Sequence, residues 1–343
     1  MIAKLLSGLG LCCLLWPATA AEQDKPQAAY MLPRAVNSVL TDIIPVADQF
    51  YMAAGERGHL LKSKDGAQWQ QVPVPLNSNL TSVYFADASH GWAVGHDASI
   101  LYSQDGGDSW QIQQYLPQLD KPLFDVVFLD ANQGIAVGAY GMFYRTTDGG
   151  QHWNTEFHPE LASEDDQALL AELKATDPEG YAAEAESVLP HFNRLFRDGQ
   201  TLYMVGEAGF VAISHDFGVS WQRLAEFYNG SLFAIARTPA KTLLVAGLRG
   251  HLFRSTDQGQ QWQQIQLPSP ATLNSLFVAA DGVVYATGNG GTLLVSRDDG
   301  QTFNAIALEE GKAILQMVAI GAQLVLATEA GIKTIQPEDK TQP

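Results

Sequence analysis

The sequence predicts an all-β fold, a seven-bladed β-propeller, and three observations support this prediction. A segment of seven or eight residues with the pattern Ser/Thr-x-Asp-x-Gly-x-x-Trp, or a close variant of it, recurs six times along the chain. Four of the five intervals between successive aspartates of this segment are 40 to 43 residues long. Three apolar runs, separated by turn signals, precede each copy. Such a period with four short strands per unit is typical of small sheets repeated around a ring.

The recurring segment, here called the box, joins the third strand of each repeat to the fourth. Its serine or threonine and its aspartate accept hydrogen bonds from backbone N–H groups of a tight turn, and its glycine takes a positive φ. Its tryptophan begins the fourth strand and buries a large ring against the neighbouring blade. The predicted structural residues of the boxes are Asp65, Asp105, Trp110, Asp148, Trp153, Asp216, Trp221, Asp257, Trp262 and Asp298.

A catalytic or calcium-binding role is the rival interpretation of the boxes. Calcium takes about six to eight converging oxygen ligands, whereas each box offers one carboxylate at the anchoring position beside apolar neighbours. Six copies spread around a ring also cannot converge on one substrate. We therefore interpret the boxes as parts of the scaffold.

Seven repeats follow one another from residue 36 to residue 336, which we expect to form the propeller. Six have a box, and the seventh, over residues 314–335, has three apolar runs but no box. Because an open sheet edge is a liability, we expect residues 21–35 to supply the missing edge strand of the seventh blade and close the ring. Residues 337–343 are expected to form a C-terminal tail.

One interval between boxes is longer than the others, at 68 residues, and the surplus predicts a short helical insert over residues 158–188, between blades 3 and 4. Ser163 is a suitable helix N-cap and is followed by acidic residues. Leu169, Leu170 and Leu173 fall on one side of the predicted helix. We expect the insert to project from the same face as the turns between second and third strands, as a lid or docking element or as a solvated decoration.

The first 20 residues have the pattern of a secretory signal peptide. Lys4 is followed by an apolar run over 5–16, and the small residues Ala18-Thr19-Ala20 form a cleavage site. The run is shorter than the roughly 20 residues of a membrane span. We therefore expect an exported protein in the periplasm that does not span a membrane. Lys4 is the only charged residue of this segment, so the net charge falls from −17 to −18 on its removal, which disfavours nucleic acid as a partner.

Binding residues are expected at the tips of the turns between second and third strands, where the repeats differ in chemistry. The central channel offers a second set of equivalent positions, of which Arg194 and Asp125 are the main candidates. These positions are Asp42, Ser82, Asp125, Arg194, Ala234, Ser275 and Gln316. The alternative is that these turns are polar because turns generally are, and that the channel residues are hydrated. The candidate partner-binding residues are Arg57, His96, Asp97, Tyr140, Glu207, Arg249, Asn289, Arg194 and Asp125.

Metal and catalytic motifs have weak support in this sequence. The eight histidines include no HxxxH or HExxH pair, the two cysteines are both in the predicted signal peptide, and no GxSxG motif occurs. We therefore expect no metal, no cofactor and no enzymatic activity.

The boxes resemble the Asp-box, or bacterial neuraminidase, repeat of sialidases, other exo-glycosidases and non-enzymatic propellers. The runs GWAVGHDASILYSQDGGDSW (91–110) and GIAVGAYGMFYRTTDGGQHW (134–153) are more closely similar to the photosystem II stability/assembly factor family. This resemblance implies an exported, non-enzymatic assembly factor or scaffold that binds a membrane protein complex on its exported side. The location would be the thylakoid lumen in a photosynthetic host or the periplasm otherwise, and we expect a monomer. An exo-glycosidase or glycan-binding lectin is the alternative, although the Arg-Ile-Pro motif of sialidases does not occur.

Overall fold

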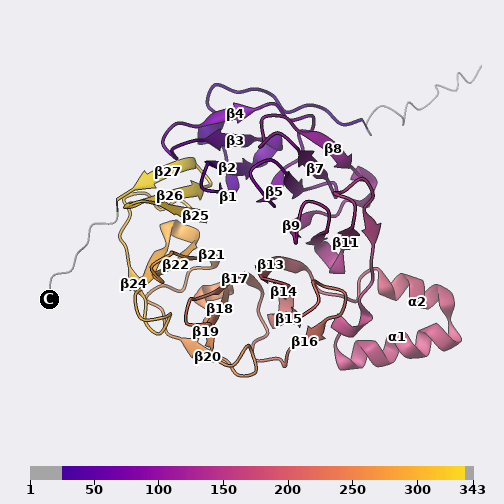
Figure 1. Ribbon diagram of the computed structural model, residues 1–343. Coiled ribbons are helices and arrows are strands. Elements are labelled where there is room, and N and C mark those ends of the chain that lie inside the picture. Colours follow the sequence, from indigo (N-terminus) through magenta and orange to yellow (C-terminus); the bar gives the residue numbers. More distant parts are fainter. Residues whose placement is uncertain (1–24, 337–343) are drawn as a thin grey trace, which may run out of the picture.

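The computed structural model describes residues 25–336, and its strands form seven sheets arranged around a central channel (Figure 1). Six of these sheets have four antiparallel strands, and the seventh has three. The predicted seven-bladed propeller is confirmed. The signal peptide predicted for residues 1–20 and the tail predicted for residues 337–343 lie outside the described residues.

Each blade is an antiparallel meander whose first strand lines the channel. Blades 1 to 3 contain β1 Leu40–Val46, β2 Phe50–Gly55, β3 Leu60–Ser63 and β4 Gln70–Val72; β5 Leu80–Phe85, β6 Gly91–Gly95, β7 Ile100–Ser103 and β8 Gln111–Gln114; β9 Leu123–Phe128, β10 Gly134–Gly138, β11 Phe143–Thr146 and β12 Asn154–Thr155. Blades 4 and 5 contain β13 Phe192–Asp198, β14 Thr201–Gly206, β15 Val211–Ser214 and β16 Gln222–Arg223; β17 Leu232–Arg237, β18 Leu243–Gly247, β19 Leu252–Ser255 and β20 Gln263–Ile265. Blades 6 and 7 contain β21 Leu273–Val278, β22 Val284–Gly288, β23 Leu293–Ser296 and β24 Asn304–Ala305; β25 Ile314–Ile320, β26 Gln323–Thr328 and β27 Gly331–Ile335.

The second strand of each blade is the most completely buried, because neighbouring blades cover both of its faces. All residues of β6, β10, β18 and β22 are buried. A strand covered on both faces has a continuous apolar sequence instead of an alternating one. This explains runs such as GWAVG and GIAVG in the repeats.

The boxes are closed by their own side chains. In blade 2, the Ser103 hydroxyl donates to Asp105 Oδ1 over 2.8 Å and accepts from Gly107 N–H over 2.8 Å. Asp105 Oδ1 also accepts from Ser109 N–H over 2.9 Å. Gly107 has φ +85°, and a Cβ at this position would lie 2.2 Å from Met52 Cε. The carboxylate is therefore occupied by the turn that it stabilises.

Hydrogen bonds to the box carboxylates make the protein sensitive to acid. The backbone N–H and the ring of His152 lower the pKa of Asp148 from 3.8 to about 2. Burial would raise the pKa of Asp216, but bonds from Ser220 and Ser214 outweigh it and lower this pKa to about 2. A pKa that is lower in the folded state stabilises the fold above the unfolded value, and this stabilisation is lost as the pH falls through the folded value.

We therefore expect the melting temperature to fall steeply as the pH is lowered from about 4 to about 2. Thermal unfolding at a series of pH values measures this. The Asp148→Asn variant should lose less stability than the wild type over the same range, because its box no longer titrates. An identical acid dependence in the two proteins would contradict this assignment.

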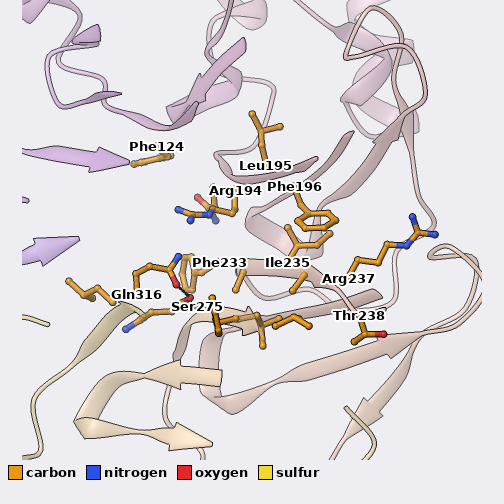
Figure 2. A pocket seen from close by; sticks show the side chains of 18 of the residues that line it. Phe124, Arg194, Leu195, Phe196, Phe233, Ile235, Arg237, Thr238, Ser275 and Gln316 are labelled. Carbon is orange, nitrogen blue, oxygen red and sulfur yellow. Dashed lines mark hydrogen bonds between the residues drawn. The ribbon is translucent and has the colours of Figure 1, made fainter. Parts of the chain in front are cut away.

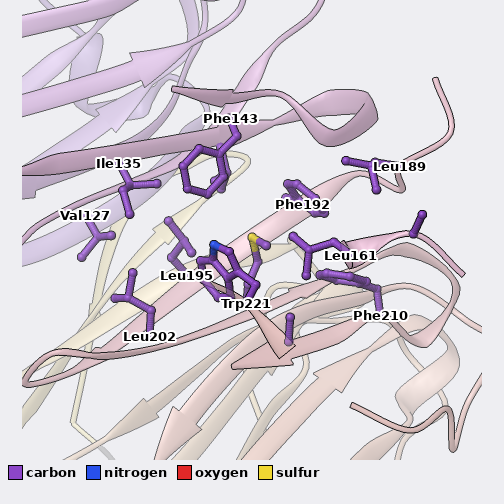
Figure 3. Close-up of a cluster of buried hydrophobic side chains, with 14 of the residues drawn as sticks. Val127, Ile135, Phe143, Leu161, Leu189, Phe192, Leu195, Leu202, Phe210 and Trp221 are labelled. Carbon is purple, nitrogen blue, oxygen red and sulfur yellow. The ribbon is translucent and has the colours of Figure 1, made fainter. Parts of the chain in front are cut away.

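Box aromatics fill the interfaces between successive blades. Trp221 of blade 4 is 7% exposed and packs with Phe143 and Ile135 of blade 3 (Figure 3). Equivalent rings contribute to five further interfaces. These rings are Trp69 between blades 7 and 1, Trp110 between blades 1 and 2, Trp153 between blades 2 and 3, Trp262 between blades 4 and 5, and Phe303 between blades 5 and 6.

The prediction that residues 21–35 close blade 7 is wrong for its described part, residues 25–35. This segment lies along blade 1 instead, where Ala29 N–H donates to the Val74 carbonyl over 2.9 Å. The Gln71 side chain bonds to the backbone of Tyr30 and Leu32. The Gln71 amide thus satisfies the Leu32 N–H and the Tyr30 carbonyl, and the segment needs no strand partner for these two groups. Among the described residues, no fourth strand joins β27.

The ring closes by side-chain packing between blades 7 and 1. A buried cluster joins Val318 and Val325 of blade 7 to Ile43 and Leu61 of blade 1. The short 3₁₀ turn Ala35–Asn37 contributes Ala35 to the same cluster. Burial of apolar side chains therefore closes the ring at this interface, where we had expected an N-terminal strand added to blade 7 to close it.

The insert forms two helices, α1 Glu164–Thr176 and α2 Pro178–Ala185, which follow β12 and precede β13 in the chain. Ser163 is the N-cap, as predicted, and its hydroxyl accepts from Asp166 N–H over 3.2 Å. Leu170 is buried, but Leu169 is 41% exposed. Figure 1 shows both helices outside the ring of blades, so they do not cover its centre. No helix among the described residues is long and apolar enough to cross a membrane.

Candidate functional site

The turns between second and third strands lie together on one face of the ring, here called the turn face. They share one hydrogen bond, in which the first turn residue donates its N–H to the carbonyl just before the inner strand of the same blade; examples are Ala139 to Pro122 and Glu207 to His191. In four blades the next residue has a left-handed conformation, with φ between 51° and 56°, and is exposed: Arg57, Tyr140, Ala208 and Arg249. This conformation is unfavourable for residues other than glycine, so the surrounding fold holds these four residues in it. Their side chains are exposed on the turn face.

Tyr140 is the centre of an aromatic patch on the turn face. Tyr140 is 48% exposed. Its ring meets the His191 ring edge-on, with 4.5 Å between the ring centres. The Phe124 ring lies 5.7 Å from the His191 ring, centre to centre. We call Tyr140, His191 and Phe124 the aromatic patch. Lys121 lies over the Tyr140 ring at 5.3 Å, which adds a cation–π contact.

Glu207 is joined to the aromatic patch through His191. Its carboxylate accepts from the His191 backbone N–H over 3.2 Å and lies 3.5 Å from His191 Nδ1. Two of the predicted tip residues, Tyr140 and Glu207, are therefore brought together by a third that the sequence did not single out.

The remaining predicted tip residues do not converge. Arg57, His96 and Arg249 are exposed on three different blades. The Asp97 carboxylate accepts from the Ser78 hydroxyl, and Asn289 accepts from the Asn274 amide over 3.0 Å. These two side chains therefore serve the turns in which they lie.

Arg194 and Asp125 meet in the channel, as the sequence placed them, together with Asp42. Arg194 Nε lies 3.5 Å from Asp125 Oδ2, and its Nη2 lies 3.7 Å from Asp42 Oδ1. The Ser82 hydroxyl has one proton to donate and lies within hydrogen-bond distance of both carboxylates, 2.8 Å from Asp125 Oδ1 and 3.1 Å from Asp42 Oδ2. Asp125 also accepts from Leu195 N–H of the next blade over 2.8 Å. The cluster therefore ties four blades together.

Burial raises the pKa of Asp125, although Arg194 and the hydrogen bonds from Leu195 and Ser82 act in the opposite direction. For Arg194, burial would lower the pKa, but attraction by Asp125 and Asp42 outweighs it and raises the pKa. One guanidinium thus faces two carboxylates whose own side chains are 1% and 7% exposed. Its charge is already engaged within the protein.

A cavity of about 970 Å³ occupies the channel beside this cluster (Figure 2). The second residue of each inner strand lines it, at a position where the strand register shifts. Such bulges redirect a side chain. The seven residues are Thr41, Thr81, Phe124, Asn193, Phe233, Asn274 and Leu315.

These seven positions differ in what they offer to a ligand. At four of them a threonine hydroxyl or an asparagine amide donates to a carbonyl of the next blade, over 2.8 to 3.0 Å. Phe124, Phe233 and Leu315 lack such a donor and remain half-buried. The mouth of the channel therefore offers apolar contacts at three positions, and Phe124 links it to the aromatic patch.

Sequence reasoning missed His191, Phe124, Phe233 and Lys121. A signal was present for the two phenylalanines, because they interrupt a repeat position otherwise held by threonine, asparagine or leucine. His191 and Lys121 precede inner strands at positions that no motif marks. Within residues 25–336, no group of three or more His, Cys, Asp or Glu side chains is arranged to hold a metal ion.

Comparison with known proteins adds two kinds of relative. Residues 61–121 match the family model described as "Photosynthesis system II assembly factor YCF48". The chain is 48% identical over 48 residues to "Photosystem II assembly protein Ycf48" of Synechococcus sp. (strain JA-3-3Ab), covering 13% of this chain and 14% of that protein. It is 33% identical over 113 residues to "Photosystem II stability/assembly factor HCF136, chloroplastic" of Arabidopsis thaliana, covering 30% of this chain and 27% of that protein. The matches thus span less than a third of these relatives.

Solved structures match over most of the chain. "YCF48 bound to D1 peptide" has a TM-score of 0.67 at 20% identity and covers 91% of this chain and 97% of that one. "YCF48 from Cyanidioschyzon merolae" has a TM-score of 0.64 at 20% identity, with 91% and 100% covered. At this identity the likeness shows the fold. The matching repeats and the curated relatives show that part of the chain is similar to photosystem II assembly and stability factors.

Proposed function

We propose that this protein is an exported, non-enzymatic assembly factor that holds a segment of a membrane-protein partner on its turn face. The observation that carries the proposal is the aromatic patch beside the apolar mouth of the channel. Aromatic side chains held by their neighbours are typical anchors of protein interfaces. A solved propeller of similar fold is described as bound to a peptide of D1, which supports a peptide as the ligand.

The chemistry of the face indicates what kind of segment it binds. Tyr140 and Phe124 offer exposed or half-buried rings, and Phe233 and Leu315 continue the apolar surface into the channel. Arg194 is already paired with two carboxylates, so it is not free to anchor an acidic group. The partner segment therefore places large apolar side chains at the mouth, and its affinity does not depend on a terminal carboxylate.

The absence of catalysis is part of the same proposal. The Asp125 carboxylate accepts bonds from backbone N–H groups and from Ser82, and the box carboxylates accept bonds from their own turns. Groups committed in this way serve the fold. For the location we propose the exported side of a membrane, in the periplasm or the thylakoid lumen, after removal of residues 1–20.

Site-specific photo-crosslinking tests where the partner binds. A benzoylphenylalanine at position 140 should crosslink to one membrane protein in the envelope of the host. The same probe at position 219 should not, because Val219 is 69% exposed but lies in a box, at the opposite edge of its blade. Equal crosslinking from the two positions, or none from position 140, would refute the proposed site.

Tyr140→Ala is expected to weaken binding of the crosslinked segment, made as a synthetic peptide, about tenfold or more. The loss removes the ring that contacts His191 and Lys121. Tyr140→Phe keeps the ring and should bind within about threefold of the wild type, since aromatic area supplies most of an anchor of this kind. Isothermal titration calorimetry measures both affinities, with Val219→Ala as the control. Unchanged affinity in Tyr140→Ala would count against the aromatic patch.

A further inference from the structure

The filled interfaces between blades show what a complete interface contains. In three of them a box aromatic from the following blade lies in the same buried cluster as an aliphatic residue at or just after the fourth strand of the preceding blade. Val72 lies in one cluster with Trp110, Leu224 with Trp262, and Ile265 with Phe303. These aliphatic residues are 7%, 6% and 5% exposed.

Among residues 25–336, no box aromatic enters the interface between blades 6 and 7. Ile335 stands where the other repeats have the serine or threonine that opens the box, and residues 336–343 include no Phe, Trp or Tyr. Ile306 of blade 6 is equivalent to Ile265 of blade 5, eight residues after the box aspartate. It is only half-buried, because no box ring of the described part of the chain covers it.

A groove follows from this missing ring. It has a volume of about 890 Å³ and lies between blades 6 and 7, lined by Val295, Ile306, Leu308, Leu326 and Ile335 among others. We call it the blade 6–7 groove. Its aliphatic side chains belong to the buried cluster of this interface or pack against it. An apolar surface of this kind is stabilised by a covering group.

The groove runs beside a sheet edge that has no strand partner among the described residues. In blade 1, Leu60, Leu61 and Lys62 of the third strand pair with β4. Ile332, Lys333 and Thr334 of β27 occupy the same places in blade 7, judged by their pairing with β26. Their outer N–H and C=O groups are therefore available for an added strand.

We propose that the blade 6–7 groove and the edge of β27 together form a docking site for an extended segment of a partner polypeptide. The segment adds to β27 as the fourth strand of blade 7 and places one large aromatic side chain over Ile306. Strand addition supplies main-chain hydrogen bonds, and the pocket supplies side-chain selectivity. The six other interfaces define the occupant, because each holds a Trp or Phe followed by a strand of two to four residues.

Charge at the groove is balanced. Lys333 pairs with Glu310 over 3.1 Å, and Lys312 lies 3.7 Å from Glu329. These exposed pairs give no net preference for a strongly acidic or basic segment. The occupant is therefore a polar strand with an aromatic anchor, like the chain's own fourth strands. This site is separate from the aromatic patch, so either proposal can fail without the other.

A peptide copied from the chain itself tests the site. The probe is QWQQIQL, residues 261–267, which contains Trp262 and the β20 strand. We expect it to bind the full exported chain, and we expect the same peptide with serine in place of its tryptophan to bind at least tenfold more weakly. Isothermal titration calorimetry or fluorescence anisotropy measures both. Equal affinity of the two peptides, or no binding by either, would overturn the proposal.

Protein variants locate the binding. Ile306→Arg blocks the groove and should weaken the probe at least tenfold, whereas Val219→Arg, the same kind of change at an exposed box residue, should not. Equal binding to both variants would show that the peptide binds elsewhere and would overturn the proposal. Thermal unfolding checks that each variant is folded, and the comparison of the two peptides needs no variant.

A second copy of this chain is the competing occupant, since Tyr30, Met31 and Leu32 are 72%, 53% and 39% exposed. Sedimentation of the wild type separates the two cases. A concentration-dependent dimer that Ile306→Arg dissociates would assign the groove to self-association and overturn the proposal of a separate partner. A monomer that binds the probe supports it.

Discussion

Replacing Trp110 with alanine is expected to lower the free energy of unfolding by about 3–5 kcal/mol, the range for truncating a large buried aromatic residue. Trp110 is 6% exposed and meets Phe85 edge-on at 6.0 Å. Its indole N–H donates to the Gly107 carbonyl over 3.1 Å. Trp110 also lies in one buried cluster with Met52 and Val72 of blade 1. The substitution therefore removes packing between blades 1 and 2 and a bond that closes the box.

Chemical denaturation followed by tryptophan-independent circular dichroism measures this loss. Val219→Ala, at a residue that is 69% exposed, is the control and should change stability by less than about 0.5 kcal/mol. A loss below about 1 kcal/mol in Trp110→Ala would show that box aromatics do not hold the blades together. It would also remove the reason for expecting a ring in the blade 6–7 groove.

Arg194→Met is expected to destabilise the protein by about 3 kcal/mol, near the lower end for breaking a buried ion pair. The methionine leaves Asp42 and Asp125 in the channel wall without their counter-charge. The loss falls near the lower end because the Arg194 side chain is 27% exposed, so water reaches the site. Arg194→Lys retains the charge and should lose less.

The pH dependence of this variant follows from the direction of the Asp125 pKa. Burial raises this pKa in the folded protein, so the folded state binds a proton more readily than the unfolded state does. Stability attributable to this group therefore falls as the pH rises above the unfolded value. Removing Arg194 raises the pKa further, and we expect the difference between wild type and Arg194→Met to be larger at pH 8 than at pH 5.

A double variant separates charge from packing. Arg194→Met combined with Asp125→Asn should be more stable than Arg194→Met alone, because a neutral amide replaces one unpaired carboxylate. If the single and double variants unfold at the same denaturant concentration at every pH, the ion pair contributes nothing that packing does not.

Local signals in the sequence were sufficient for most of the fold. The boxes, the seven repeats and the Ser163 cap each depend on residues close together in the chain, where turn and capping rules apply. The way the ring closes was harder to predict, because the N-terminal segment could lie along the outer edge of blade 7 or along that of blade 1. The Gln71 side chain holds this segment along blade 1 through bonds to the backbone of Tyr30 and Leu32. No pattern in the sequence marks such a contact.

The candidate site was only partly predictable for the same reason. Tyr140 was one of several candidates at the turn tips, and Arg194 was predicted to carry a charge in the channel. Their importance depends on His191 and Asp42, which come from other parts of the chain. The sequence also predicted the insert and its N-cap, but not that its two helices lie outside the ring of blades.

We propose that this protein assists assembly of a membrane complex through its turn face. The most direct measurement is the amount of assembled complex, by native gel electrophoresis, in a host strain whose own copy is replaced by wild type, Tyr140→Ala or Val219→Ala. We predict that Tyr140→Ala leaves subunit synthesis unchanged but lowers the amount of assembled complex, while Val219→Ala matches the wild type. Unchanged assembly of the envelope complexes in the Tyr140→Ala strain and in a strain lacking the protein would contradict the account.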